Sequence, residues 1–415
     1  MNILENKKVL LTNFEITQFS GSEITITSIA SQFKKLGYTV YMASLNYEEP
    51  LFSSVKTEFD VIINLFEDEF DFSEIEFDIV WSQHTFLLDS LIFDRGLKAK
   101  KIVASSLSPF ESFESMPVYS DDLSLIIANS VETKKVLQDE GIKEIELFEN
   151  FSYTSYFENP KKVDKLKKIA IVSNHIPEEM MEALELLKEK EYIVDIYGLA
   201  GQKKLITDEI LKQYDAIISI GKTVQYAMSL KIPVYIYDRF GGPGYLRKTN
   251  IEENRMHNFS GRGYSKNTPE NIVEDIISNY SSVIEDLGDI HTYAYENFCF
   301  EENFSKILSK LEEKIEVNLE SIINKYSKYK RKLLLPERIV RYISTREYGK
   351  AFSKLEKTYV ARIELAESDN KVILSELKKV EAENKELRKK ILLITAKNEK
   401  SKRISTFVKN VFGKK

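Results

Sequence analysis

Two separate series of short apolar runs that alternate with amphipathic stretches limit the fold more than any other feature. The first series has runs at 7–13, 39–43, 59–64, 77–82, 101–105 and 124–129, with helical spacing over 24–35. The second has runs at 168–173, 192–197, 215–220 and 233–237, with helical stretches at 177–188, 206–213 and 223–230. Continuous apolar strands separated by helices indicate parallel sheets covered on both faces. The sequence therefore predicts an α/β protein with two doubly wound, Rossmann-like domains.

The 415 residues are expected to divide into five parts. Residues 1–158 form a first Rossmann-like domain, and residues 165–316 form a second one with a return helix. Residues 317–350 form a basic helical connector that packs on the body, residues 351–398 a coiled coil, and residues 399–415 a basic amphipathic tail. Two tandem domains of this kind usually bind a ligand in the cleft between them, at the carboxyl ends of their strands.

Composition excludes several classes of protein. With 43% hydrophobic residues the chain has enough material for buried cores, so wholesale disorder is excluded. The single cysteine, Cys299, cannot form an internal disulfide and has no neighbouring cluster that could hold zinc. The segment 1–8 is too polar for a signal peptide, and no apolar run reaches about 18 residues. We expect a cytoplasmic protein without a metal or a cofactor.

The C-terminal quarter is basic although the whole chain has a net charge of −6. Residues 317–415 carry 26 Lys and Arg against 12 Asp and Glu, whereas residues 1–316 carry 33 against 53. Residues 402–415 place apolar side chains on one helical face with lysines around it, which suits an anionic membrane surface. Simple solubilising charge is the alternative. Nucleic acid is an unlikely partner, because no aromatic residues alternate with the basic ones.

A heptad pattern over 352–396 indicates a parallel homodimer. Its first core position is occupied in turn by Ile363, Asn370, Leu377, Asn384 and Ile391. Asparagines at such positions favour a two-stranded parallel coiled coil in fixed register. A single long solvated helix is the alternative. Together with the tail, this pattern suggests a dimer peripheral to the inner face of the cell membrane.

The loops that follow strands of the second domain hold the candidate residues for a diphosphate. Gly221, Lys222 and Thr223 end one strand and begin the next helix, where N–H groups and a lysine suit an anion. The segment is not a Walker A loop, because position 216 is Ala216 instead of glycine. A plain helix cap is the alternative. Two further loops beside the same cleft hold Ser173, Asn174, His175 and Gly198.

Five of the fifteen glycines lie in the two motifs YDRFGGPGYL and HNFSGRG. Such loops let main-chain N–H groups approach a ligand closely, so we expect a binding loop rather than simple turns. Its candidate residues are Asp238, Gly241, Gly242, Asn258 and Arg262.

In the first domain, two loops are candidates for contact with a substrate. Gly21, Ser22 and Glu23 open the first helix, although capping that helix is an equally good explanation. His84 directly follows the strand 77–82, where an imidazole could exchange a proton or bind a hydroxyl. A structural histidine is the alternative, and His257 and His291 are weaker candidates.

These motifs resemble group 1 (family 4-like) glycosyltransferases, which have the two-Rossmann GT-B architecture. Four segments carry the resemblance over about residues 7–300: Ser20–Glu23 before the first helix, Asp78–Val80 leading to His84, Ile127–Ser130 with Thr133, and Tyr226–Val234. The pair YDRFGGPGYL and NFSGR is similar to a subgroup found beside bacterial surface-polysaccharide genes.

The resemblance implies transfer of a sugar from a nucleotide sugar to a glycan, a lipid-linked acceptor or a protein acceptor. Lys222 and the N–H groups of 221–223 would then neutralise the leaving diphosphate, with Arg262 or His175 as helpers. His84 and Gly21 would line the acceptor side, which makes His84 and Lys222 the candidate catalytic residues. The family's two glutamates, expected near Ile217 and at Gln225, are missing. A non-catalytic scaffold subunit is therefore the main alternative, and a nucleotide-sugar epimerase a weaker one.

Overall fold

The first domain is built on a seven-stranded parallel sheet in a computed structural model that describes residues 7–65, 68–108 and 114–327. Its strand order is β3-β2-β1-β4-β5-β6-β7, so the chain reverses its direction of travel across the sheet between β1 and β4. The strands are β1 (Lys8–Thr12), β2 (Thr39–Ser44), β3 (Val61–Asn64), β4 (Glu76–Gln83), β5 (Lys98–Ser106), β6 (Leu125–Ala128) and β7 (Ile145–Leu147). The helices are α1 (Gly21–Lys35), α2 (Phe52–Val55), α3 (Phe86–Phe93) and α4 (Val131–Asp139).

The second domain has a five-stranded sheet in the order β12-β11-β10-β8-β9. Its strands are β8 (Lys168–Val172), β9 (Ile193–Tyr197), β10 (Ala216–Ser219), β11 (Val234–Asp238) and β12 (Gly241–Tyr245), of which β12 alone runs antiparallel to its neighbour. The helices are α5 (Thr154–Glu158), α6 (Glu178–Glu189), α7 (Asp208–Leu211), α8 (Lys222–Ser229), α9 (Ile251–Met256), α10 (Pro269–Ser278), α11 (Tyr280–Ile284) and α12 (Leu287–Phe298). The predicted pair of Rossmann-like domains is confirmed.

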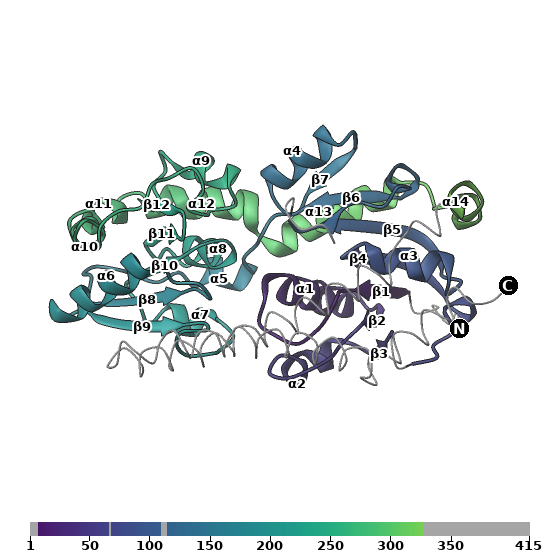
Figure 1. The fold of residues 1–415 in the computed structure, drawn as a ribbon, viewed down its shortest axis with the longest axis horizontal. Coiled ribbons are helices and arrows are strands. Elements are labelled where there is room, and N and C mark those ends of the chain that lie inside the picture. Colours follow the sequence, from purple (N-terminus) through teal and green to yellow (C-terminus); the bar gives the residue numbers. More distant parts are fainter. Residues whose placement is uncertain (1–6, 66–67, 109–113, 328–415) are drawn as a thin grey trace, which may run out of the picture.

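The chain crosses between the domains twice, at the same place. Ser152 on the outward pass lies beside Cys299 on the return pass, and Phe300 N–H donates to the Ser152 carbonyl at 2.9 Å. From there α13 (Phe300–Glu313) runs back across the first domain, as Figure 1 shows in light green. The two passes therefore lie side by side where the chain connects the two domains.

The expected domain limits differ from those of the structure at both ends. Tyr156 and Phe157, which were placed in the first domain, pack in the core of the second. Residues 300–316, which were placed in the second domain, contribute Phe304 and Leu311 to the core of the first. The reason is physical: α13 has one apolar face, and Trp81, stacked on Phe304 at 5.9 Å, supplies the surface that buries it.

Residues 317–327, the described part of the expected connector, pack on the first domain. Val317 N–H donates to the Lys100 carbonyl at 2.8 Å, and helix α14 (Leu319–Tyr326) buries Ile322 beside α3. The coiled coil at 351–398, the tail at 399–415 and the rest of the connector lie outside the described residues. No helix among the residues that the structure describes is long and apolar enough to span a membrane.

Candidate functional site

The turn from β10 into α8 has the geometry of an anion site. Gly221 adopts φ +56° and ψ −134°, a conformation in which a side chain would be strained, and a Cβ built on it would meet nothing within 4 Å. The next two backbone N–H groups, those of Lys222 and Thr223, donate to no acceptor among the described residues. A helix N-terminus with free N–H groups carries partial positive charge. This turn is where the sequence predicts a diphosphate.

Lys222 adds a buried cation to this turn. Its ammonium is inaccessible, although the residue as a whole is only partly buried, and it has no hydrogen-bond partner among the described residues. It lies 4.0 Å above the ring of Phe151, in the first interdomain crossing, and 5.9 Å from the ring of Tyr226. Burial lowers the pKa of Lys222 from its usual 10.5 to about 7. Within the described part of the chain, the ammonium has no carboxylate to neutralise it.

The two neighbouring loops reach the same edge of the sheet. β8 lies between β10 and β9, so the loops after these three strands are adjacent. Gly198 at φ +120° approaches so closely that a Cβ there would lie 2.1 Å from the Ser173 carbonyl oxygen. Asn174 and His175 are exposed beside it, and the Ser173 hydroxyl accepts a hydrogen bond from His175 N–H at 3.1 Å. The predicted residues of these loops are thus brought together, with polar side chains facing solvent.

Part of the predicted glycine-rich binding loop is a strand instead. Gly241 and Gly242 lie in β12, where a Cβ would be 2.2 Å from the Ser265 carbonyl oxygen and 2.0 Å from that of Ile236. These glycines are explained by the close approach of backbones rather than by a ligand. Asp238 is also engaged within the protein, because it accepts from the N–H groups of Phe240 at 2.8 Å and Gly261 at 3.0 Å.

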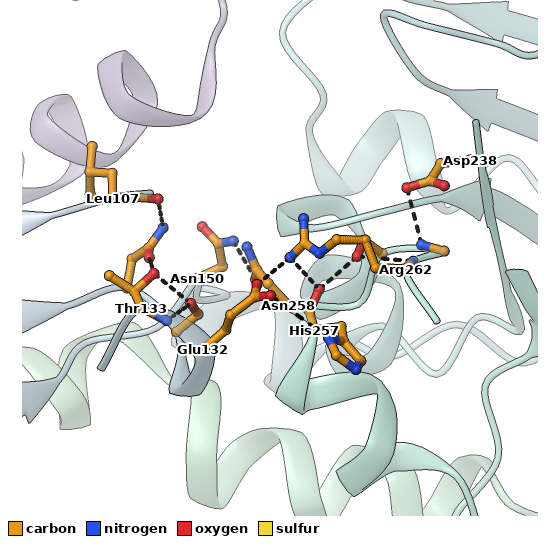
Figure 2. Close-up of polar contacts among 12 residues, drawn as sticks. Leu107, Glu132, Thr133, Asn150, Asp238, His257, Asn258 and Arg262 are labelled. Carbon is orange, nitrogen blue, oxygen red and sulfur yellow. Dashed lines mark hydrogen bonds and ion pairs between the residues drawn. The ribbon is translucent and has the colours of Figure 1, made fainter. Parts of the chain in front are cut away.

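The NFSGR motif connects the α8 turn to the first domain. Asn258 and Phe259 both have positive φ, and the Phe259 carbonyl accepts from Gly221 N–H at 3.2 Å. Figure 2 shows Arg262 reaching Glu132 at the start of α4, and Asn150 donating to Asn258 at 3.1 Å. The sequence offered no signal for Glu132 as the partner of Arg262, because the two lie on different domains.

Of the three candidate residues that open the first helix, Glu23 is engaged within the protein, whereas Gly21 borders open space. The Glu23 carboxylate is buried and accepts from the N–H groups of Thr17 at 2.6 Å and Gln18 at 2.9 Å. These bonds hold the loop before α1 and do not cap the helix, whose N-cap residue Ser20 makes no side-chain cap hydrogen bond. Gly21 and Ser22 begin α1, and a Cβ on Gly21 would meet nothing within 4 Å.

His84 is held on both sides of its ring. It is buried at the end of β4 with φ +54°. Its Nδ1 accepts from Phe14 N–H at 3.0 Å, and its Nε2 lies 3.2 Å from a Glu114 carboxylate oxygen. Both ring nitrogens thus face groups of the protein, so in this conformation neither nitrogen is available to a substrate.

The side chain of Gln225 is directed toward the backbone at the start of α8. With its amide nitrogen facing the helix start, it donates to the carbonyl of Gly221 at 2.6 Å and that of Lys222 at 3.2 Å. Both Gln225 and Ile217 are buried, so no carboxylate stands where the resembling family has its glutamates. No group of three or more His, Cys, Asp or Glu residues in the described ranges could hold a metal ion.

Comparison with known proteins supports the fold. No protein-family profile matches the chain, and neither does any curated protein sequence. A glycosyltransferase from Rickettsia africae ESF-5 is similar in structure, with a TM-score of 0.50 and 16% identity over 74% of this chain and 98% of that one. An alpha-glucosyltransferase in complex with UDP and DNA has a TM-score of 0.47 and 10% identity over 74% of this chain and 100% of that one. The chain has the GT-B fold.

Proposed function

We propose that this chain is a glycosyltransferase that binds the diphosphate of a nucleotide-sugar donor at the start of α8. One observation supports this most: within the described ranges, the Lys222 ammonium is buried without an anionic partner, and the neighbouring N–H groups of Lys222 and Thr223 donate to no acceptor. A buried unpaired charge is costly, so it is retained where a ligand supplies the opposite charge. The solved glycosyltransferases with the same fold point to the same class of reaction.

The proposed chemistry follows from charge. When the bond between the sugar and the diphosphate breaks, negative charge increases on the leaving phosphate. Lys222 and the two N–H groups would stabilise that charge, and a site fixed before the reaction needs no reorganisation. Ser173, Asn174 and His175 border this edge and would contact the rest of the nucleotide, while Gly21 and Ser22 would face the sugar or the acceptor.

The acceptor and the setting follow from the sequence motifs. We propose a cell-surface glycan, or a lipid-linked or protein-linked precursor of one, because YDRFGGPGYL and NFSGR resemble enzymes of that group. The heptads at 352–396 support a homodimer, and the basic tail supports contact with an anionic membrane.

Isothermal titration calorimetry with a panel of UDP, GDP, ADP and dTDP sugars tests the donor site. We expect one class of donor to bind, and the variant Lys222→Met to weaken binding about 10- to 100-fold, as expected for a hydrogen bond to a charged group. Lys190→Met removes an exposed lysine at the end of α6 and is the control. Equal donor affinity in Lys222→Met and the wild type would exclude the diphosphate role.

A non-catalytic scaffold of the same fold is the second candidate. The position of Gln225, whose amide is used inside the protein, favours it, because no glutamate there can contact a donor sugar. Absence of heat with every nucleotide sugar would support the scaffold.

A further inference from the structure

Two buried amide side chains at the end of the first sheet have hydrogen-bonding atoms without partners. Gln83 ends β4 and Asn13 follows β1, and both side chains are completely buried. Among the described residues, neither amide atom of Gln83 has a partner, and the side-chain oxygen of Asn13 lacks one as well. A buried polar group that stays unpaired destabilises the folded state. The fold therefore retains these amides at a cost that no contact with the described part of the chain offsets.

Strand pairing places Asn13 and Gln83 beside each other at the end of the sheet. Thr12, the last residue of β1, pairs with Ser82, and their hydroxyls are 2.8 Å apart on one side. Side chains alternate along a strand, so Gln83, the last residue of β4, lies on the opposite side, and Asn13 directly follows Thr12 beyond the end of β1. Gln83 also pairs with Ser105 of β5, which belongs to the same face. Trp81 lies on this face and contacts Phe148. Phe148 in turn contacts Phe151, the residue whose ring lies beneath Lys222.

The other polar candidates at this edge are already used within the protein. His84 accepts from Phe14 N–H and faces Glu114, and Glu23 accepts from two backbone N–H groups. Gln83 and Asn13 keep free hydrogen-bonding capacity. An amide offers a donor and an acceptor, as does a sugar hydroxyl. A phosphate is a poor match, because the Glu114 carboxylate contacts His84, the residue next to Gln83.

We propose that Gln83 and Asn13 form a subsite for the hydroxyl groups of a neutral sugar. The proposal rests on the proposed function and deepens it, by naming residues of the first domain that would recognise carbohydrate. Because neither side chain has exposed surface, the edge must open to admit the ring. The sugar comes from the donor or from the acceptor, and both sources present the same hydroxyl chemistry.

The only tryptophan of the chain provides a direct test. Trp81 lies two residues before Gln83 on the same strand and face, so its fluorescence reports on this edge. We expect glucose, mannose, galactose or N-acetylglucosamine to change the fluorescence of the full chain in a saturable way. The change should disappear in Gln83→Leu and persist in Gln138→Leu, which makes the same substitution at an exposed position of α4.

Two further measurements complete the test. The first shows whether Gln83→Leu loses sugar binding or loses its fold, and the second shows whether the bound sugar belongs to the donor or to the acceptor. Gln83→Leu should unfold in urea at the same or a higher concentration than the wild type, because it removes unpaired amide atoms. If the subsite holds the donor's sugar, the ratio of affinities for a nucleotide sugar and its bare nucleoside diphosphate should fall about tenfold, the equivalent of one hydrogen bond. An unchanged ratio with loss of the Trp81 response assigns the acceptor's sugar.

The proposal is overturned if no sugar changes Trp81 fluorescence in the wild type and the affinity ratio is the same in Gln83→Leu. Failure of the proposed donor site gives a different result. In that case no nucleotide binds, and the Trp81 titration with free sugars still decides whether Gln83 contacts carbohydrate.

Discussion

Replacing Lys222 by methionine should make the protein more stable while it weakens donor binding. Methionine keeps the unbranched shape of the side chain, so the contacts with Phe151 and Tyr226 are largely preserved. It removes the charge that burial disfavours. A residue that serves only the fold would behave in the opposite way, because its replacement would destabilise the protein.

The lowered pKa of Lys222 gives the size of the effect. The change from 10.5 in the unfolded chain to about 7 in the folded one corresponds to about 5 kcal/mol, at 1.36 kcal/mol per pKa unit. Attraction between the ammonium and the Phe151 ring returns about 0.5–2 kcal/mol of this. We therefore expect Lys222→Met to raise the free energy of unfolding by about 3–4.5 kcal/mol at pH 7.

The stabilisation should depend on pH with a definite sign. Between about pH 7 and pH 10.5 the unfolded chain binds a proton at Lys222 that the folded protein does not bind, so wild-type stability rises with pH. Methionine binds no proton at any pH. The advantage of the variant should be largest at and below pH 7, and it should shrink toward zero as the pH approaches 10.5.

Urea unfolding of both proteins at pH 7, 8 and 9, followed by circular dichroism, measures this difference. Lys190→Met, at an exposed position, should match the wild type at each pH. If Lys222→Met is no more stable than the wild type at pH 7, or if its advantage does not depend on pH, the ammonium is not buried and unpaired as the structure has it.

Two predictions concern the framework around the site. Gly198→Ala should cost about 2–4 kcal/mol of unfolding free energy, because its Cβ would lie 2.1 Å from the Ser173 carbonyl oxygen and φ is +120°. The control Gly21→Ala should change the unfolding free energy by less than about 1 kcal/mol. Equal urea midpoints for the two variants would contradict this prediction. Phe304→Ala should lower the unfolding free energy by about 3–5 kcal/mol, because this ring of α13 is buried against Trp81. The control Ile315→Ala should leave the unfolding free energy unchanged, because Ile315 is 87% exposed. A Phe304→Ala protein with an unchanged urea midpoint would show that α13 is dispensable for the first domain.

The sheets could be predicted because periodicity is a local property. Each continuous apolar run became a parallel strand, from β1 to β11, with ends within a few residues of the expected ones. β7 and β12 were missed. β7 has only three residues, and β12 consists of Gly241–Tyr245, whose glycines suggest a loop until the closeness of the Ser265 and Ile236 backbones is known.

The return of the chain to the first domain could not be predicted, because an apolar helix face does not reveal which surface will cover it. The apolar side chains Phe300, Phe304 and Leu311 could pack in the core of either domain. In the structure they pack in the first domain, where Phe304 has aromatic neighbours. The ion pair between Arg262 and Glu132 could not be predicted either, because its two residues belong to different domains. Contacts between distant segments depend on the relative position of the two domains, on which local sequence carries no signal.

The polar contacts of the second domain indicate which cation a diphosphate would meet most easily. Arg262 is paired with Glu132, so an incoming phosphate would have to compete with a carboxylate and loosen a contact between the domains. Lys222 has no such competitor among the described residues. The Gly221 N–H donates to the Phe259 carbonyl, and Phe259 has a positive φ that strains its backbone. Phe259 and Arg262 belong to one motif, so in the proposed function a donor that draws Gly221 toward itself would also act on the segment that holds the Arg262–Glu132 pair. Such a coupling between the α8 turn and the contact of the two domains would pass through residues 258–262.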